Sequence, residues 1–222
     1  KAVVLHDCDP AAAHLLGRCM TAAIMTASLL PEKQRINVSW RYPGSLKTIV
    51  VDAGQDGATR GMISPSHLGS AADNQALYGD IGSIQVVRTE RGKVLNSGTT
   101  PVSLHDPVSD LAYYFSISDQ VETALRAVIA LKPDVESPVS LSHGIMMQAL
   151  PGCDLERLDR IRNRMQSESF LRDIESELSP RDIQSSLEGL AQEEEALLGV
   201  VLEEAPAPYF SCNCSQEKMV AV

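Results

Sequence analysis

The 222-residue sequence has few aromatic residues, no excess of basic charge and no long uninterrupted apolar run. It holds 19 Lys and Arg against 29 Asp and Glu, which gives a net charge of −10 at pH 7. Because binding to a phosphate backbone needs a basic surface, we expect no nucleic acid partner. The most apolar stretch, 11–30, is interrupted by His14 and Arg18. We therefore predict a buried helix there, with no membrane span and no membrane partner.

Sequence motifs of common enzyme classes are also missing. The glycine-containing pieces 52–57 and 79–82 lack the Gly-Lys-Ser/Thr of a phosphate-binding loop, so we interpret them as turns. The five histidines show no metal-ligand spacing, and Ser142-His143 lacks the context of a nucleophile elbow. The prediction is that this chain is not an enzyme.

Five cysteines, an odd number, do not make the disulfide framework of a secreted protein. The sequence shows no signal peptide, so we expect a reducing, cytoplasmic location. Cys19 is predicted to be a small buried hydrophobe, and Cys8 and Cys153 to be inert thiols. The chain opens on Lys1 and a strand-like Ala-Val-Val-Leu without Met, and we expect either end to be trimmed.

The pattern of apolar residues predicts an α+β fold with a mostly antiparallel sheet core and packed helices, followed by a small helical linker. Asp9 and Pro10 are typical of a helix start, as N-cap and first-turn residue. Segment 64–82 is expected to be a loop. Predicted helices cover 10–30, 106–117, 154–164, 168–178 and 179–190, and predicted strands cover 34–42, 46–51, 58–63, 83–89, 93–97, 121–131 and 139–150.

Most of the negative charge lies in one segment, 166–206. It contains eleven acidic and two basic residues, a net charge of −9, so the rest of the chain is close to neutral. Its two predicted helices, the second with Ser179 as N-cap, carry few apolar positions. Dense like charge with a thin apolar face predicts a marginally stable layer. We therefore divide the chain into a core domain 1–165, an acidic helical linker 166–206 and a C-terminal module 207–222.

Cys212 and Cys214 stand two positions apart, directly after the Pro-rich run 205–208. Two thiolates at this spacing can bind one soft metal ion or can pair as a disulfide. A structural zinc site needs four ligands, and this pair supplies two. The pair therefore predicts half of a metal or redox site.

The order of several motifs resembles the redox-regulated chaperone family known as heat shock protein 33, over most of the chain. The segments Leu16-Gly17-Arg18 and Asp110–Phe115, the latter followed by Ser118-Asp119-Gln120, are similar to family motifs, with Asp119 in place of Glu. His143–Gly152 is similar to the family's Gly-Gly-Met-Leu-Val-Gln-Leu-Leu-Pro-Gly strand. Tyr209–Lys218 is similar to the entry of its zinc module.

This resemblance implies an ATP-independent holdase that binds unfolding or oxidatively damaged client proteins and can form a homodimer when oxidised. It implies zinc as cofactor, held in the reduced state by Cys212, Cys214 and a later Cys-x-x-Cys pair. That second pair is absent, which we interpret as truncation. Oxidation, with Cys212 and Cys214 as the expected disulfide, would release zinc and undock the linker 166–206.

Two other functions are consistent with the same cysteines. A thiol-disulfide oxidoreductase could use Cys212 and Cys214 on a substrate, but a reactive thiol needs an electropositive setting. Here Glu203 and Glu204 precede the pair and only Lys218 is basic nearby, which disfavours this alternative. A structural zinc module for protein docking would have activity that does not depend on oxidant.

Overall fold

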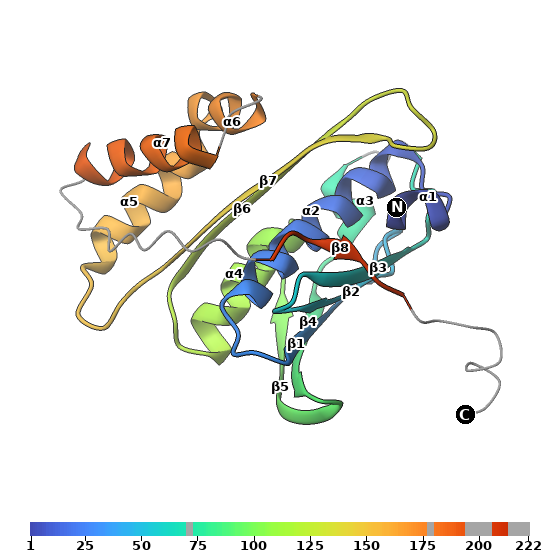
Figure 1. The fold of residues 1–222 in the computed structure, drawn as a ribbon, viewed down its shortest axis with the longest axis horizontal. Helices are drawn as coiled ribbons and strands as arrows, with labels where there is room; N and C mark the ends of the chain where they lie inside the picture. The colour runs from blue at the N-terminus through green and yellow to red at the C-terminus, as the bar shows by residue number, and fades with distance from the viewer. Residues whose placement is uncertain (70–72, 177–179, 194–205, 213–222) are drawn as a thin grey trace.

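The computed structural model describes residues 1–69, 73–176, 180–193 and 206–212 (Figure 1). A six-stranded sheet has the order β5-β4-β1-β2-β3-β8, and β6 and β7 form a separate two-stranded sheet. The strands are β1 Gln34–Arg41, β2 Thr48–Gly54, β3 Ala58–Ser64, β4 Gly82–Glu90, β5 Lys93–Val102, β6 Thr123–Leu131, β7 Val139–Gln148 and β8 Tyr209–Phe210. The helices are α1 Ala2–Leu5, α2 Pro10–Ser28, α3 Asn74–Tyr78, α4 Pro107–Ser118, α5 Leu155–Met165, α6 Glu168–Glu175 and α7 Pro180–Glu193. This arrangement confirms the predicted α+β class.

The first three strands form the predicted antiparallel meander. Alternate residues of β1 point to one face, where Ile36, Val38 and Trp40 are completely buried. The indole of Trp40 donates a hydrogen bond of 2.8 Å to the carbonyl of Pro107 at the start of α4. The apolar alternation therefore buries one face of the sheet against helices, as the period of two predicts.

Helix α2 lies between the six-stranded sheet and the β6–β7 sheet (Figure 1). Asp9 caps it as predicted, because its carboxylate accepts a hydrogen bond of 2.8 Å from the Ala12 amide. Small buried residues, Ala22 and Ala23 among them, allow both sheets to approach it. The helices in the described part of the chain all fall short of the length or apolarity that a membrane crossing requires.

Two local predictions are wrong. Ala2–Leu5, predicted as strand-like, is the short helix α1, because Ala2 and Val3 turn toward the core and the His6 amide bonds to the Ala2 carbonyl at 3.0 Å. Inside the segment 64–82, predicted as loop, Asn74–Tyr78 forms α3. Asp73 caps that helix through a bond of 2.7 Å from the Ala76 amide, which the loop-like composition concealed.

The long β6–β7 hairpin carries the C-terminal helices on its outer side (Figure 1). Helices α5, α6 and α7 confirm the helices predicted over 154–164, 168–178 and 179–190, although α6 ends at Glu175. The predicted N-cap Ser179 lies outside the described residues. The hairpin is therefore covered by α2 on one face and by this helical layer on the other.

Candidate functional site

Cys212 lies directly after a strand that joins the core sheet. Strand β8 runs parallel to β3, with Ala58 opposite Tyr209 and Thr59 opposite Phe210. The Tyr209 amide donates to the Gly57 carbonyl at 2.9 Å, and the Ser211 amide donates to the Thr59 carbonyl at 2.9 Å. The sequence did not predict this pairing. It holds the exposed Cys212 at the edge of the sheet, while Cys214 lies outside the described residues.

Glycine at position 57 is required where the chain before β8 crosses the β2–β3 turn. Gly57 has φ +82°, and a Cβ atom there would come within 2.8 Å of the Ala207 carbonyl oxygen. Glycine adopts this left-handed backbone conformation without strain, and its lack of a side chain lets the segment before β8 lie close to the turn.

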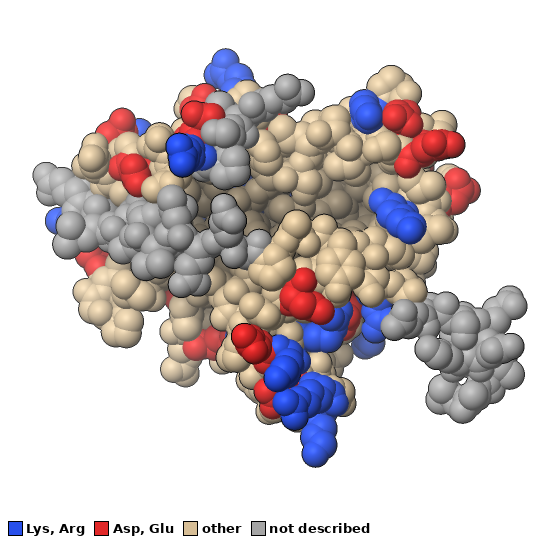
Figure 2. All heavy atoms as spheres, in the orientation of Figure 1, with Lys and Arg blue, Asp and Glu red and all other residues tan. Residues whose placement is uncertain are grey.

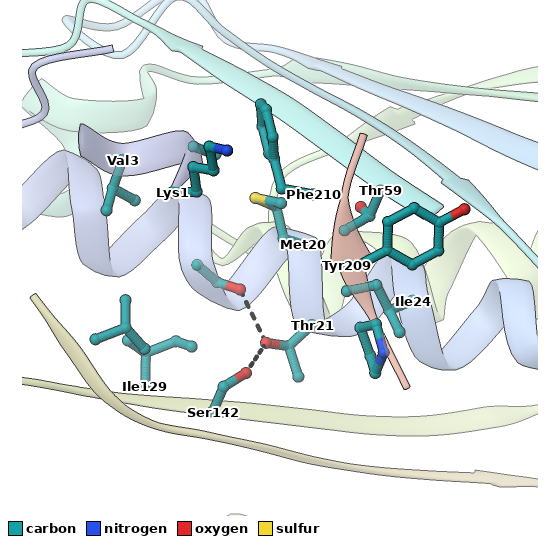
Figure 3. A pocket seen from close by; sticks show the side chains of 14 residues that line it. Lys1, Val3, Met20, Thr21, Ile24, Thr59, Ile129, Ser142, Tyr209 and Phe210 are labelled. Atoms are coloured by element: carbon teal, nitrogen blue, oxygen red, sulfur yellow. Dashed lines mark hydrogen bonds between the residues drawn. The ribbon is translucent and has the colours of Figure 1, made fainter. Parts of the chain in front are cut away.

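An apolar groove of about 230 Å³ lies between β8, α1, α2 and the β6–β7 hairpin (Figure 3). Met20 and Ile24 from α2 and Ile129 from β6 line it together with Phe210. The Thr21 hydroxyl donates to the Gly17 carbonyl at 2.9 Å and lies 2.8 Å from the Ser142 hydroxyl, which joins α2 to β7 (Figure 3). The groove therefore connects the strand next to Cys212 with the hairpin.

Cys8 and Cys19 are less exposed than Cys212. Cys19 is 1% exposed, which confirms that it is a buried hydrophobe. Burial raises the pKa of Cys19 far above its usual range, and burial followed by the neighbouring Asp9 raises the pKa of Cys8. Both thiols are therefore poor nucleophiles. Cys153 is exposed, before α5.

A second apolar cluster, here called the outer cluster, fixes the helical layer to the hairpin. Its buried members come from the hairpin and from the three helices that cover it. They are Ala124, Val128, Leu141 and Ile145 of the hairpin, Ile161 and Met165 of α5, Phe170 and Ile174 of α6, and Leu190 of α7. The cluster is much smaller than the main core around α2. Helices α6 and α7 belong to the acidic segment 166–206, so the described helices of that segment are held in place by a few apolar side chains.

Polar contacts supplement the outer cluster. His143 Nδ1 on β7 donates to the Ile174 carbonyl over 3.0 Å, and Arg162 on α5 pairs with Glu122 at 2.9 Å. Arg164 of α5 pairs with Glu193 of α7. The contact of His143 with α6 gives this histidine a part in docking the layer that no sequence signal marked.

Charge is unevenly distributed over the face shown in Figure 2. Lys and Arg gather at the end of the molecule where the β4–β5 hairpin lies in Figure 1, with Asp and Glu among them. The hollowed middle of this face is formed mainly by uncharged side chains. This face therefore offers uncharged surface beside the helical layer.

The described residues do not fit a complete zinc site. Thiolates are suitable zinc ligands, and Cys212 is one candidate. Within 1–69, 73–176, 180–193 and 206–212, however, no group of three or more His, Cys, Asp or Glu side chains is placed to hold a metal ion. A structural zinc ion needs four ligands, so the remaining ligands are not supplied by this part of the chain.

Comparison with known proteins gives a consistent result. A family model described as "Hsp33 protein" matches residues 1–222. A 33 kDa chaperonin of Staphylococcus haemolyticus is 29% identical over 229 residues, covering 99% of this chain and 74% of the relative. Another, of Bacillus licheniformis, is 29% identical over 220 residues, covering 96% of this chain and 73% of the relative. The crystal structure of the 33 kDa chaperonin of Thermotoga maritima superposes with a TM-score of 0.75 at 21% identity, covering 96% of this chain and 72% of that one.

Proposed function

Because the chain belongs to the Hsp33 family, which consists of non-enzymatic chaperones, we propose that it is a redox-regulated, ATP-independent holdase that binds unfolding proteins. The observation that carries this proposal is the outer cluster: a thin, acidic helical layer covers an apolar hairpin face. Undocking of α6 and α7 would uncover Val128, Ile145 and their neighbours. An exposed apolar surface of that kind binds unfolded chains without regard to their sequence.

The proposed trigger is oxidation of Cys212 and Cys214. Their two thiols would lose two protons and two electrons to hydrogen peroxide, which forms one disulfide and two molecules of water. Cys212 lies two residues after β8, and β8 pairs with β3 of the core sheet. A disulfide at Cys212 would therefore change the backbone conformation next to a strand of that sheet. We propose that this change loosens helices α6 and α7 from the hairpin.

The proposal includes a zinc ion, for which the cysteine pair is part of the ligand set. Cys212 and Cys214 would supply two thiolates, and zinc bound to them would keep them deprotonated and close together.

Replacing both cysteines should abolish activation by oxidant. The variant with Cys212→Ser and Cys214→Ser cannot form the disulfide, so peroxide should leave its activity at the reduced level. Light scattering of a thermally denaturing client, with and without peroxide, measures this. The matched control Cys153→Ser keeps the pair and should respond like the wild type.

Three results would contradict this function. Full activation of the double variant by peroxide would place the switch elsewhere. Turnover by the wild type in a disulfide reduction assay would favour an oxidoreductase. Hydrogen exchange should show segment 166–206 losing protection on oxidation while β1 and β2 keep theirs, and equal protection in both redox states would exclude undocking.

A further inference from the structure

We infer that β8 occupies, within the chain, a binding site for extended apolar segments of unfolding proteins, formed by the edge of β3 and the groove beside it. The inference rests on the proposed chaperone function and adds to it one place and one mode of client binding. It is separate from the outer cluster, because Ile129 and Ser142 of the hairpin line the groove, whereas their neighbours Val128 and Leu141 belong to the outer cluster.

The first support is the edge of β3. Strand β3 pairs along its inner edge with β2 from Ala53↔Thr59 to Thr48↔Ser64. On its outer edge, within the part of the chain that the structure describes, the ladder pairs are those of Ala58 and Thr59 with β8. An open strand edge offers backbone donors and acceptors to any extended chain. Such hydrogen bonds do not depend on side chains, which suits a protein that must accept clients of many sequences.

The second support is the groove beside this edge. Phe210 is partly buried against the main core and lies with Met20 and Ile24 at the groove (Figure 3). The ammonium group of Lys1 lies 5.9 Å from the centre of the Phe210 ring, a cation–π arrangement. The groove would accept an aromatic or aliphatic client side chain in the position of Phe210, and an aromatic one would also keep the cation–π contact with Lys1. The occupant is therefore an extended segment with a large apolar residue.

The third support is the shortness of β8. It is a two-residue strand, it follows Pro206 and Pro208, which have no amide hydrogen to donate, and Tyr209 is 52% exposed. An element held by so few buried contacts opens locally at a much lower free energy than global unfolding requires. Because Cys212 comes two positions after Phe210, its oxidation acts directly beside this strand.

The test removes one hydrogen bond of β8. Ser211→Pro eliminates the amide that donates to Thr59, and the matched control Ser211→Ala retains it. The probe is a fluorescein-labelled peptide that copies residues 206–212 with Cys212→Ser. Loss of one backbone hydrogen bond should make the reduced Ser211→Pro protein bind this peptide about tenfold more tightly than Ser211→Ala does. Unlabelled reduced, carboxymethylated α-lactalbumin, a permanently unfolded protein, should compete with it.

Hydrogen exchange locates the binding. The amides of Thr59 and Gly61 should gain protection when Ser211→Pro binds α-lactalbumin. Tyr209→Pro, which removes the bond to Gly57, should behave in the same way. If both variants fail to fold, the same exchange measurement on peroxide-treated wild type decides.

The outcomes separate the two proposals. Suppression of client aggregation without peptide binding and without protection of β3 would overturn this site and leave the proposed function standing. Failure of peroxide-treated wild type to suppress aggregation would overturn the proposed function, whatever the peptide does.

Discussion

Ile174→Asp is expected to make the protein bind unfolding clients without any oxidant. Ile174 is 1% exposed in the outer cluster, between α6 and the hairpin. An aspartate there loses the apolar contacts and buries a carboxylate, at a cost of about 3 kcal/mol or more. Since each 1.4 kcal/mol changes an equilibrium about tenfold, the undocked population should rise by roughly 100-fold. Light scattering of a denaturing client under reducing conditions measures the result.

The control for this prediction is Ser169→Asp, which adds the same charge to the same helix at an exposed position. It should leave the reduced protein inactive. Hydrogen exchange of Ile174→Asp should show loss of protection in α6 and α7, with β1 and β2 unchanged. An undocked layer in this variant without gain of client binding would show that the hairpin face is not the client surface.

The stability of the core is expected to fall as pH rises from 4 to 7 because of Asp110. This carboxyl is completely buried; it accepts bonds from the Tyr42 hydroxyl at 2.5 Å and the Leu104 amide at 3.2 Å. Burial raises the pKa of Asp110 to about 6, and the bond from Tyr42 opposes that rise. An unfolded aspartate has a pKa of about 3.9. Its stabilising proton is thus fully present below about pH 4 and lost as pH rises through 6.

Asp110→Asn should remove this pH dependence. The difference between pKa values of about 6 and 3.9 corresponds to about 3 kcal/mol at most. Asparagine keeps an acceptor for Tyr42 but turns a donor toward the Leu104 amide, which costs about 1 kcal/mol. The variant should therefore be less stable than wild type at pH 4 and more stable at pH 7.5, as measured by urea unfolding.

Asp80→Asn is the matched control for the pH experiment, because Asp80 is exposed. Its unfolding free energy should follow that of the wild type at every pH. If the unfolding free energies of wild type and Asp110→Asn changed in parallel with pH, Asp110 would not carry the proton whose loss destabilises the core.

A single physical arrangement connects the proposals for the helical layer and for β8. Helices α6 and α7 lie within the acidic segment 166–206 and β8 follows that segment in the chain. Each covers apolar surface with few contacts. Oxidation at Cys212 is therefore positioned to affect both. The three-part division 1–165, 166–206 and 207–222 stays a prediction, although β8 pairs with the core sheet and α5 packs with α6 and α7.

The sequence by itself determined the local elements and the class of fold. Alternation along β1 and the Asp9 cap of α2 act over a few residues, so they can be recognised without knowledge of the rest of the chain. The order of family motifs likewise identified the family, and the charge of 166–206 marked the thin helical layer. Ala2–Leu5 was wrongly predicted to be strand-like, because four residues are too few to show whether apolar residues recur with the period of a strand or of a helix.

Only the tertiary structure decided what the acidic segment covers and where β8 binds. The outer cluster joins Val128 to Leu190, and the β3–β8 ladder joins Thr59 to Phe210. Contacts over such separations depend on how whole elements pack, and two residues such as Tyr209 and Phe210 carry no pattern that names a partner strand. The sequence identified the residues of the proposed switch, and packing determined which surfaces that switch can uncover.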